Sequence, residues 1–251
     1  MPPKPSVLPE HFAEVYRRFQ ASISRHDCGR RCAPLNGGSP ICCSTQDAVP
    51  VVHRSEWKLL KSRSDLWRPF KPYDANTRDI VDSLHHSNCA IECKGAAFCE
   101  RDNRSLACRA FPFFPYIDRK GDFIGLSYYW DFEDRCWVIS NMQIVESEFR
   151  REFIDAFEYL FSVDPEEYDT YKKHSATMRR VFTRRRKPIA LIGREGGFFK
   201  IMPKTAKLVA ITAAQLPKFG PYRSERAYAR AVKEAEGQFP DQIELVVDAA
   251  G

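Results

Sequence analysis

Eight of the nine cysteines in this chain lie in two short segments. The first segment contains Cys28, Cys32, Cys42 and Cys43, the second contains Cys89, Cys93, Cys99 and Cys108, and Cys136 follows alone. Thiolates are soft ligands that bind zinc, iron and iron–sulfur clusters in preference to hard cations. Two segments so rich in thiols therefore indicate a metal or iron–sulfur centre.

A disulfide framework is the main alternative, and the composition argues against it. Disulfide-rich scaffolds are small secreted domains that cannot build a hydrophobic core, whereas this chain has 251 residues, of which 43% are hydrophobic. Residues 1–10 lack the apolar run of a signal peptide, and no run approaches the roughly 18 apolar residues of a membrane span. We therefore expect a cytoplasmic protein without a membrane segment, in which the thiols stay reduced.

The spacing of the first segment favours iron over zinc. Zinc fingers use CxxC-type pairs, but here three residues separate Cys28 from Cys32, and nine more precede the adjacent pair Cys42 and Cys43. Neighbouring side chains on an extended backbone point to opposite sides. The pair therefore either faces two centres that share eight ligands, or contributes one thiolate to a single larger cluster.

Other polar residues accompany the cysteines. Cations beside thiolates offset their negative charge, and the basic residues nearby are Arg25, Arg30, Arg31, Lys94, Arg101, Arg104 and Arg109. Simple solvation of these side chains is the alternative. Histidines at 26, 53, 85 and 86 lie near the cysteines, so a mixed Cys/His site is a further alternative. We favour it less than ligation by cysteines alone. The loops 29–50 and 89–108 contain few apolar residues, so metal binding would supply much of the free energy that orders them.

Together these motifs resemble the zinc- or iron-chelating, YkgJ-type (CxxCxxCC) cysteine-cluster family. The resemblance spans about residues 28–139 and includes the Gly37-Gly38 turn, the run Cys89-x9-Cys99-x8-Cys108-Arg-x-Phe-Pro, and Trp130 ahead of Cys136. Its most specific part is the CRAFP motif at 108–112. The chain departs from the family in its stretched first segment, in residues 100–105, and in the Trp-Val-Ile that follows Cys136.

The resemblance implies a ligand set and a cofactor. It aligns Cys89, rather than Cys93, with the middle cysteine of the family, so Cys93 is the surplus thiol. The predicted metal ligands are Cys28, Cys32, Cys42, Cys43, Cys89, Cys99, Cys108 and Cys136. The implied cofactor is an iron–sulfur cluster or iron, with zinc as the alternative. One related group, the flagellin lysine N-methylases, is thought to combine an iron–sulfur centre with S-adenosylmethionine, which leaves an enzymatic role open; no catalytic residue is identified.

A second feature is a run of basic residues in the second half of the chain, which has a net charge of +6 overall. It consists of Arg179, Arg180, Arg184, Arg185, Arg186 and Lys187. Cations at the carboxyl end of a helix complement its dipole, so a solvated helix end is the favoured interpretation. Contact with an acidic partner is the alternative. Nucleic acid is not favoured as a partner, because no stacking aromatic residues are interleaved with the arginines.

The patterns of apolar and turn residues predict an α+β fold, in which helices and short antiparallel strands surround an irregular cysteine-rich metal-binding core. The expected helices are 8–24, 55–61, 77–85, 147–161, 165–182 and 224–239, and the expected strands are 114–118, 122–130, 189–193, 196–202 and 207–212. A cysteine-cluster metal-binding domain is expected over residues 1–145. A helical and strand-containing C-terminal extension is expected over 146–251.

Two classes of function follow from the sequence. In the first, the thiolates hold iron–sulfur or iron for a redox or modification role, with a protein or redox partner. In the second, they hold structural zinc in an interaction module that contacts an acidic partner through the arginine run. A brown colour, which thiolate-bound iron–sulfur clusters produce, distinguishes the first class from the second.

Overall fold

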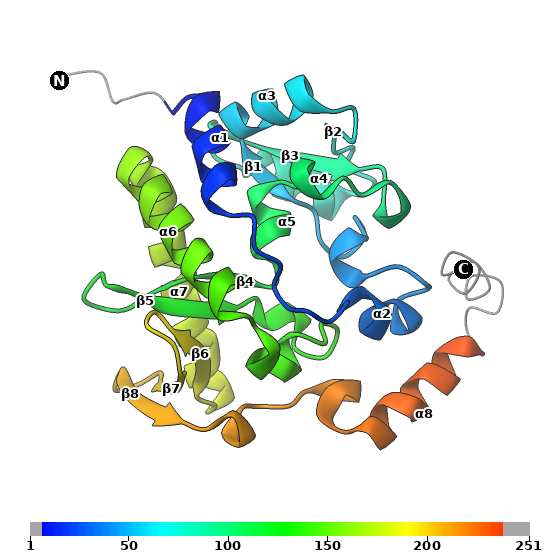
Figure 1. The fold of residues 1–251 in the computed structure, drawn as a ribbon, viewed down its shortest axis with the longest axis vertical. Coiled ribbons are helices and arrows are strands. Elements are labelled where there is room, and N and C mark those ends of the chain that lie inside the picture. Colours follow the sequence, from blue (N-terminus) through cyan, green and yellow to red (C-terminus); the bar gives the residue numbers. More distant parts are fainter. Residues whose placement is uncertain (1–6, 238–251) are drawn as a thin grey trace.

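Residues 7–237 are described by the structure, a computed structural model in which helices surround two antiparallel sheets (Figure 1). This confirms the expected α+β class. The α-helices are α1 (Pro9–Arg18), α2 (Gly29–Cys32), α3 (Arg54–Arg63), α4 (Ala75–Asp82), α5 (Leu106–Ala110), α6 (Ser147–Val163), α7 (Pro165–Arg185) and α8 (Glu225–Glu236). The strands are β1 (Val51–His53), β2 (Trp67–Pro69), β3 (Asn88–Cys93), β4 (Phe113–Ile117), β5 (Phe123–Tyr128), β6 (Ile189–Gly193), β7 (Phe198–Met202) and β8 (Lys207–Ile211).

Short 3-10 helices connect these elements. They are η1 (Ala33–Leu35), η2 (Ile41–Cys43), η3 (Ala96–Phe98), η4 (Arg101–Asn103), η5 (Trp130–Phe132), η6 (Ile139–Ile144), η7 (Ala213–Gln215) and η8 (Gly220–Arg223). Several of them lie in the two cysteine segments, where the backbone was expected to be irregular. Within residues 7–237, no helix combines the length and the apolar character needed to cross a lipid bilayer.

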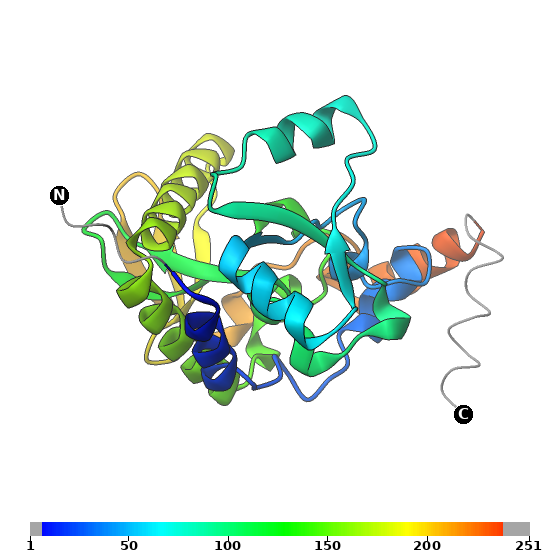
Figure 2. The same ribbon diagram turned by 90° about the horizontal axis from the view of Figure 1, so that it is seen from above.

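The small sheet carries part of the second cysteine segment. Its order is β1-β3-β2, with β3 pairing antiparallel to both neighbours, so that Val52 lies opposite Cys89 and Trp67 opposite Cys93. The expectation of an irregular backbone from residue 89 onward is therefore wrong for the first five residues. Helix α4 projects away from this sheet (Figure 2), and none of its residues is buried.

The large sheet joins the two halves of the chain. Its order is β4-β5-β6-β7-β8, and the predicted β4–β5 hairpin and all three later strands are present. Strand β6 pairs with β5 at Gly125, where the two backbones approach closely. Gly125 has φ +151°, and a Cβ atom there would lie 2.1 Å from the carbonyl oxygen of Ile192. The boundary expected at residue 145 falls between β5 and β6, so the large sheet contains strands from both expected segments.

Aromatic side chains fill the core beneath this sheet. Phe149, Phe153 and Phe157 of α6 are fully buried, as the periodicity of that helix predicts. Phe153 and Phe157 lie with their ring centroids 4.5 Å apart. Helix α6 packs against α1 and α7, and α7 packs against β4. One continuous hydrophobic core thus contains residues from both halves of the chain.

The first helix is shorter than expected, because side chains form hydrogen bonds with the backbone groups that follow its end. Helix α1 ends at Arg18 rather than near residue 24. The Glu152 carboxylate accepts the backbone N–H groups of Gln20 and Ala21 at 2.7 and 2.6 Å, and Arg109 donates to the carbonyl of Phe19 at 2.8 Å. The chain therefore leaves the helix and continues as an extended segment toward Cys28.

The arginine run is partly structural. Arg179 is buried, and its guanidinium donates to the Ile117 carbonyl at 2.7 Å. Arg185 forms an ion pair with Glu133 at 3.0 Å. Helix α7 ends at Arg185, so the favoured interpretation of a helix end rich in cations agrees with its position. Arg184, Arg186 and Lys187 are exposed.

The last expected helix is also present. Helix α8 begins after Ser224, whose hydroxyl accepts from the backbone N–H of Ala227 at 3.1 Å, so the predicted capping residue is confirmed. Its expected end at residue 239 lies outside the described residues. In Figure 1, α8 extends beside α2, at the side of the molecule where the first cysteine segment lies.

A buried carboxyl group links three elements around the second cysteine segment. Glu56 of α3 is only 3% exposed. Its Oε1 atom accepts hydrogen bonds of 2.6 Å from the hydroxyl of Tyr16 in α1 and from the backbone N–H of Leu106, the first residue of α5. Burial raises the pKa of Glu56 from 4.5 to about 7 against these two hydrogen bonds. The folded protein therefore binds a proton here that the unfolded chain has already released.

We predict that Glu56→Gln removes a loss of stability that the wild-type protein shows as pH rises from 4.5 to 7. The pKa of Glu56 is higher in the folded state, so the wild-type protein loses up to about 3 kcal/mol as pH rises from 4.5 to 7. Glutamine keeps the oxygen that accepts both hydrogen bonds and has no charge. Urea unfolding at several pH values should show the variant gaining stability relative to wild type across this range.

The matched control for this prediction is Glu14→Gln. Hydrogen bonds from Arg17 and Arg18 lower the pKa of Glu14 to about 2, so its titration does not change stability between pH 5 and 7, where Glu56 titrates. Parallel stability curves for wild type and Glu56→Gln over that range would contradict the prediction.

Candidate metal centre

A cavity of about 810 Å³ collects cysteines from both segments. Its wall is formed by the extended chain after α1, by η2, and by the region between the end of β3 and α5. The cysteines that line it are Cys28, Cys42, Cys43, Cys93, Cys99 and Cys108. Residues that are far apart in the sequence therefore present six thiols to one space.

Four of the cysteines form what we call the outer group: Cys43, Cys93, Cys99 and Cys108. The Cys93 sulfur accepts the backbone N–H of Gly95 at 3.4 Å. The Cys99 sulfur accepts a hydrogen bond of 3.1 Å from Nε of Arg104. Burial, and after it the nearby Cys93 and Cys43, raise the pKa of the Cys108 thiol to about 12. These thiols are thus close enough to influence one another electrostatically.

The remaining clustered cysteines form what we call the inner group: Cys28, Cys32, Cys42 and Cys136. Cys32 and Cys136 are each only 5% exposed. Burial is the main cause that raises the pKa of the Cys32 thiol to about 11, and Cys28 and Cys43 contribute. The pKa of Cys136 is also raised by burial, with Cys32 and Cys28 as its charged neighbours. Cys136 thus joins the first segment.

The adjacent pair connects the two groups. Cys42 and Cys43 lie in the 3-10 helix η2, so the expectation of an extended backbone at this pair is wrong. Their surroundings nevertheless differ: Cys42 has Cys32 and Cys136 as neighbours, whereas Cys43 faces Arg104. A hydrogen bond from Cys42 lowers the pKa of Cys43 to about 7, while the pKa of Cys42 is raised. The thiol of Cys43 is therefore the more readily ionised of the two.

Cys89 lies apart from both groups. It is four residues before Cys93 on β3, which places the two about 13 Å apart along the strand. Cys89 pairs with Val52 of β1, and its charged neighbours are Arg54 and Glu56. It does not line the cavity that contains Cys93. The geometry therefore favours Cys93 as the thiol that completes the outer group, with Cys89 as the surplus one.

The cysteines are free thiols, and six of them line a cavity. None of the nine forms a disulfide. No three of the His, Cys, Asp and Glu side chains in residues 7–237 form a group that could hold a metal ion as they stand. A tetrahedral zinc with bonds of about 2.3 Å needs sulfur atoms about 3.8 Å apart. A cluster spreads its thiolates over several iron atoms, so its ligands do not all have to meet at one metal ion.

Most of the basic residues near the cysteines have other partners. Lys94 pairs with Asp65, and Arg31 pairs with Glu225 beside the rings of Trp137 and Tyr228. Arg25 and Arg30 form ion pairs with Glu146 and Asp27. Arg101 donates to the hydroxyl of Ser22. Arg104 is the exception, because it donates to a cysteine sulfur.

The histidines near the segments are engaged in other contacts. His26 lines the cavity with its ring edge-on to Trp137. His53 accepts the backbone N–H of Ser55 at the start of α3, and His85 lies against His86. These placements give no support to the mixed Cys/His alternative.

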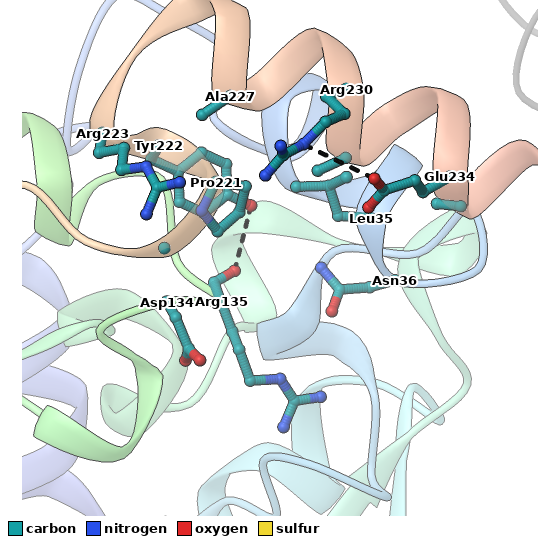
Figure 3. A pocket seen from close by; sticks show the side chains of 13 residues that line it. Leu35, Asn36, Asp134, Arg135, Pro221, Tyr222, Arg223, Ala227, Arg230 and Glu234 are labelled. Carbon is teal, nitrogen blue, oxygen red and sulfur yellow. Dashed lines mark hydrogen bonds and ion pairs between the residues drawn. The ribbon is translucent and has the colours of Figure 1, made fainter.

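A smaller cavity of about 430 Å³ lies against α8 (Figure 3). Tyr222 lines it and donates its hydroxyl to the carbonyl of Arg135 at 3.3 Å. Burial raises the pKa of Tyr222, and Cys32 and Cys136 are the next causes. Tyr222 is therefore close enough to Cys32 and Cys136 to be influenced by their charge.

Comparison with known proteins adds no relative. No family model matches the chain, and neither a curated protein nor a solved structure is similar to it. The resemblance to the YkgJ-type cysteine-cluster family thus stays a prediction from the motifs.

We predict that Cys93→Ser lowers the metal content and that Cys89→Ser does not. Serine keeps the size of the side chain but is a poor ligand for soft metals. Iron and zinc should be measured by elemental analysis in protein purified without oxygen. A loss of metal in Cys89→Ser, with full content in Cys93→Ser, would restore Cys89 as the ligand expected from the motifs.

Proposed function

We propose that this protein is a cysteine-cluster metalloprotein that binds two iron–sulfur centres, one in the outer group and one in the inner group. The observation that supports this most is that six thiols line one cavity, while the thiols of Cys32 and Cys136 are buried next to Cys42. Four thiolates are the usual ligand set of an iron–sulfur cluster. A division of eight thiols between two centres is one of the two alternatives that the sequence leaves open. Here Cys93 takes the place of Cys89 in the ligand set.

The cavity supports a redox or modification role over a purely structural one. A structural zinc site is closed and four-coordinate, whereas the outer group borders a space of about 810 Å³. Part of its wall is polar backbone and charged side chains from residues 20–29. A molecule that enters this space would meet the outer centre directly. The reaction and its substrate are not assigned.

Zinc is the second candidate, and burial is the observation that favours it. Cys32 and Cys136 are buried, as expected for structural thiolates. In that case the protein would be an interaction module, with Arg184, Arg186 and Lys187 of the arginine run exposed to an acidic partner. Membership of the YkgJ-type family and a cytoplasmic location are part of both proposals.

Metal binding would also stabilise the cysteine loops. Burial keeps the thiols of Cys32, Cys108 and Cys136 protonated at neutral pH. A metal must displace these protons, so its affinity rises with pH. The free energy of binding then becomes free energy of folding for the loops that carry these residues.

We predict that anaerobically purified protein is brown, absorbs near about 400 nm and contains iron together with acid-labile sulfide. Cys99→Ser should remove the outer centre and Cys136→Ser the inner one, so that each variant retains about half of the iron. The measurement is iron and sulfide analysis with absorbance spectra, with Cys89→Ser as the control.

Different outcomes separate the two candidates. A colourless protein that contains stoichiometric zinc would replace the first candidate with the second. Full metal content in both Cys99→Ser and Cys136→Ser would contradict the assignment of the ligands itself.

A further inference from the structure

Arg104 lies within the outer group. It lies in the chain between Cys99 and Cys108, and its side chain is half-buried in the wall of the large cavity. Its Nε atom donates to the sulfur of Cys99 at 3.1 Å. Its charge also faces Cys108 and Cys43. A single guanidinium thus interacts with three of the four outer thiols.

The nearest other cations do not share this role. Arg109 donates to the backbone carbonyls of Arg104, Phe19 and Asp102, and its guanidinium lies 4.5 Å from the ring of Tyr16. Arg101 lines the same cavity, but its guanidinium donates to Ser22. The positive charge at the outer thiols therefore comes chiefly from Arg104.

The inner group has different surroundings. Cys32 and Cys136 are buried, and their charged neighbours are other thiols. Cys28 has Asp27 as its strongest charged neighbour, with Arg104 a weaker one. An added electron is therefore stabilised less in the inner group than in the outer one.

We propose that Arg104 makes the outer centre the more easily reduced of the two, so that an electron given to the protein resides at the cavity wall. The inference rests on the proposed function. One electron from a one-electron donor adds one negative charge to a centre already held by thiolates. A nearby cation and an N–H···S hydrogen bond stabilise that charge and raise the reduction potential, whereas burial away from cations lowers it.

This inference assigns different roles to the two centres. Cys43, Cys93, Cys99 and Cys108 would hold the centre that stores the electron beside the cavity, and the other four thiols would hold the second centre. The adjacent Cys42 and Cys43 would then form a short covalent connection between the two centres. Arg104 is a positioning residue here, because it acts through the centre and not on a substrate.

The test is a redox titration of the anaerobic, metal-loaded full chain, followed by electron paramagnetic resonance, with dithionite as the reductant. Arg104→Met should lower the ratio of reduced to oxidised outer centre at least tenfold at a fixed potential, or about 59 mV for a one-electron couple. Arg104→Lys keeps the charge and should restore part of the shift. Arg101→Met is the matched control and should leave both potentials unchanged.

The outcomes distinguish the inference from the proposed function. Equal potentials in wild type and Arg104→Met, at full iron content, would overturn the role of Arg104 and leave the two centres in place. A shift of the inner centre instead of the outer one would also overturn it. Wild-type protein without iron would overturn the proposed function and this inference together. If Arg104→Met fails to fold, an unchanged potential in Arg104→Gln would overturn the inference equally.

Discussion

The structure depends on bringing thiols from distant parts of the chain to one cavity, on short elements joined by loops that contain few apolar side chains. These loops are ordered from their ends. The second segment starts on β3, whose Ile91 is fully buried, and ends on α5, where the Ser105 hydroxyl caps the helix that contains Cys108. Glu56 then connects the start of α5 to α1 and α3 through two short hydrogen bonds. The position of the cavity is thus set by the core around it.

Electrostatic repulsion opposes the gathering of these thiols once they ionise. Burial raises the pKa of most of these thiols, so gathering them costs little while they are protonated and much once they are ionised. Arg104 supplies one compensating charge, and the proposed metals would supply the rest. The thiols are therefore compatible with the fold in the neutral state, and their ionised state would require the proposed centre.

The periodic elements could be predicted from the sequence, and the irregular ones could not. The buried phenylalanines of α6 and the turn between β4 and β5 follow from local pattern, and both are present. Strand β3 was missed, because its apolar centre is only Ala90 and Ile91 between two thiols. That strand decides which of its two cysteines reaches the cavity. Arg104 was one of seven nearby cations in the sequence, and only tertiary contacts distinguish it.

The shared sheet has a consequence for synthesis on the ribosome. Strands β4 and β5 precede β6 by some sixty residues, and β5 remains an open edge until β6 pairs with it. Chains emerge at about 5–20 residues per second, so that edge and the thiols before it wait several seconds for their partners. A nascent chain in this interval is exposed to oxidation and premature pairing.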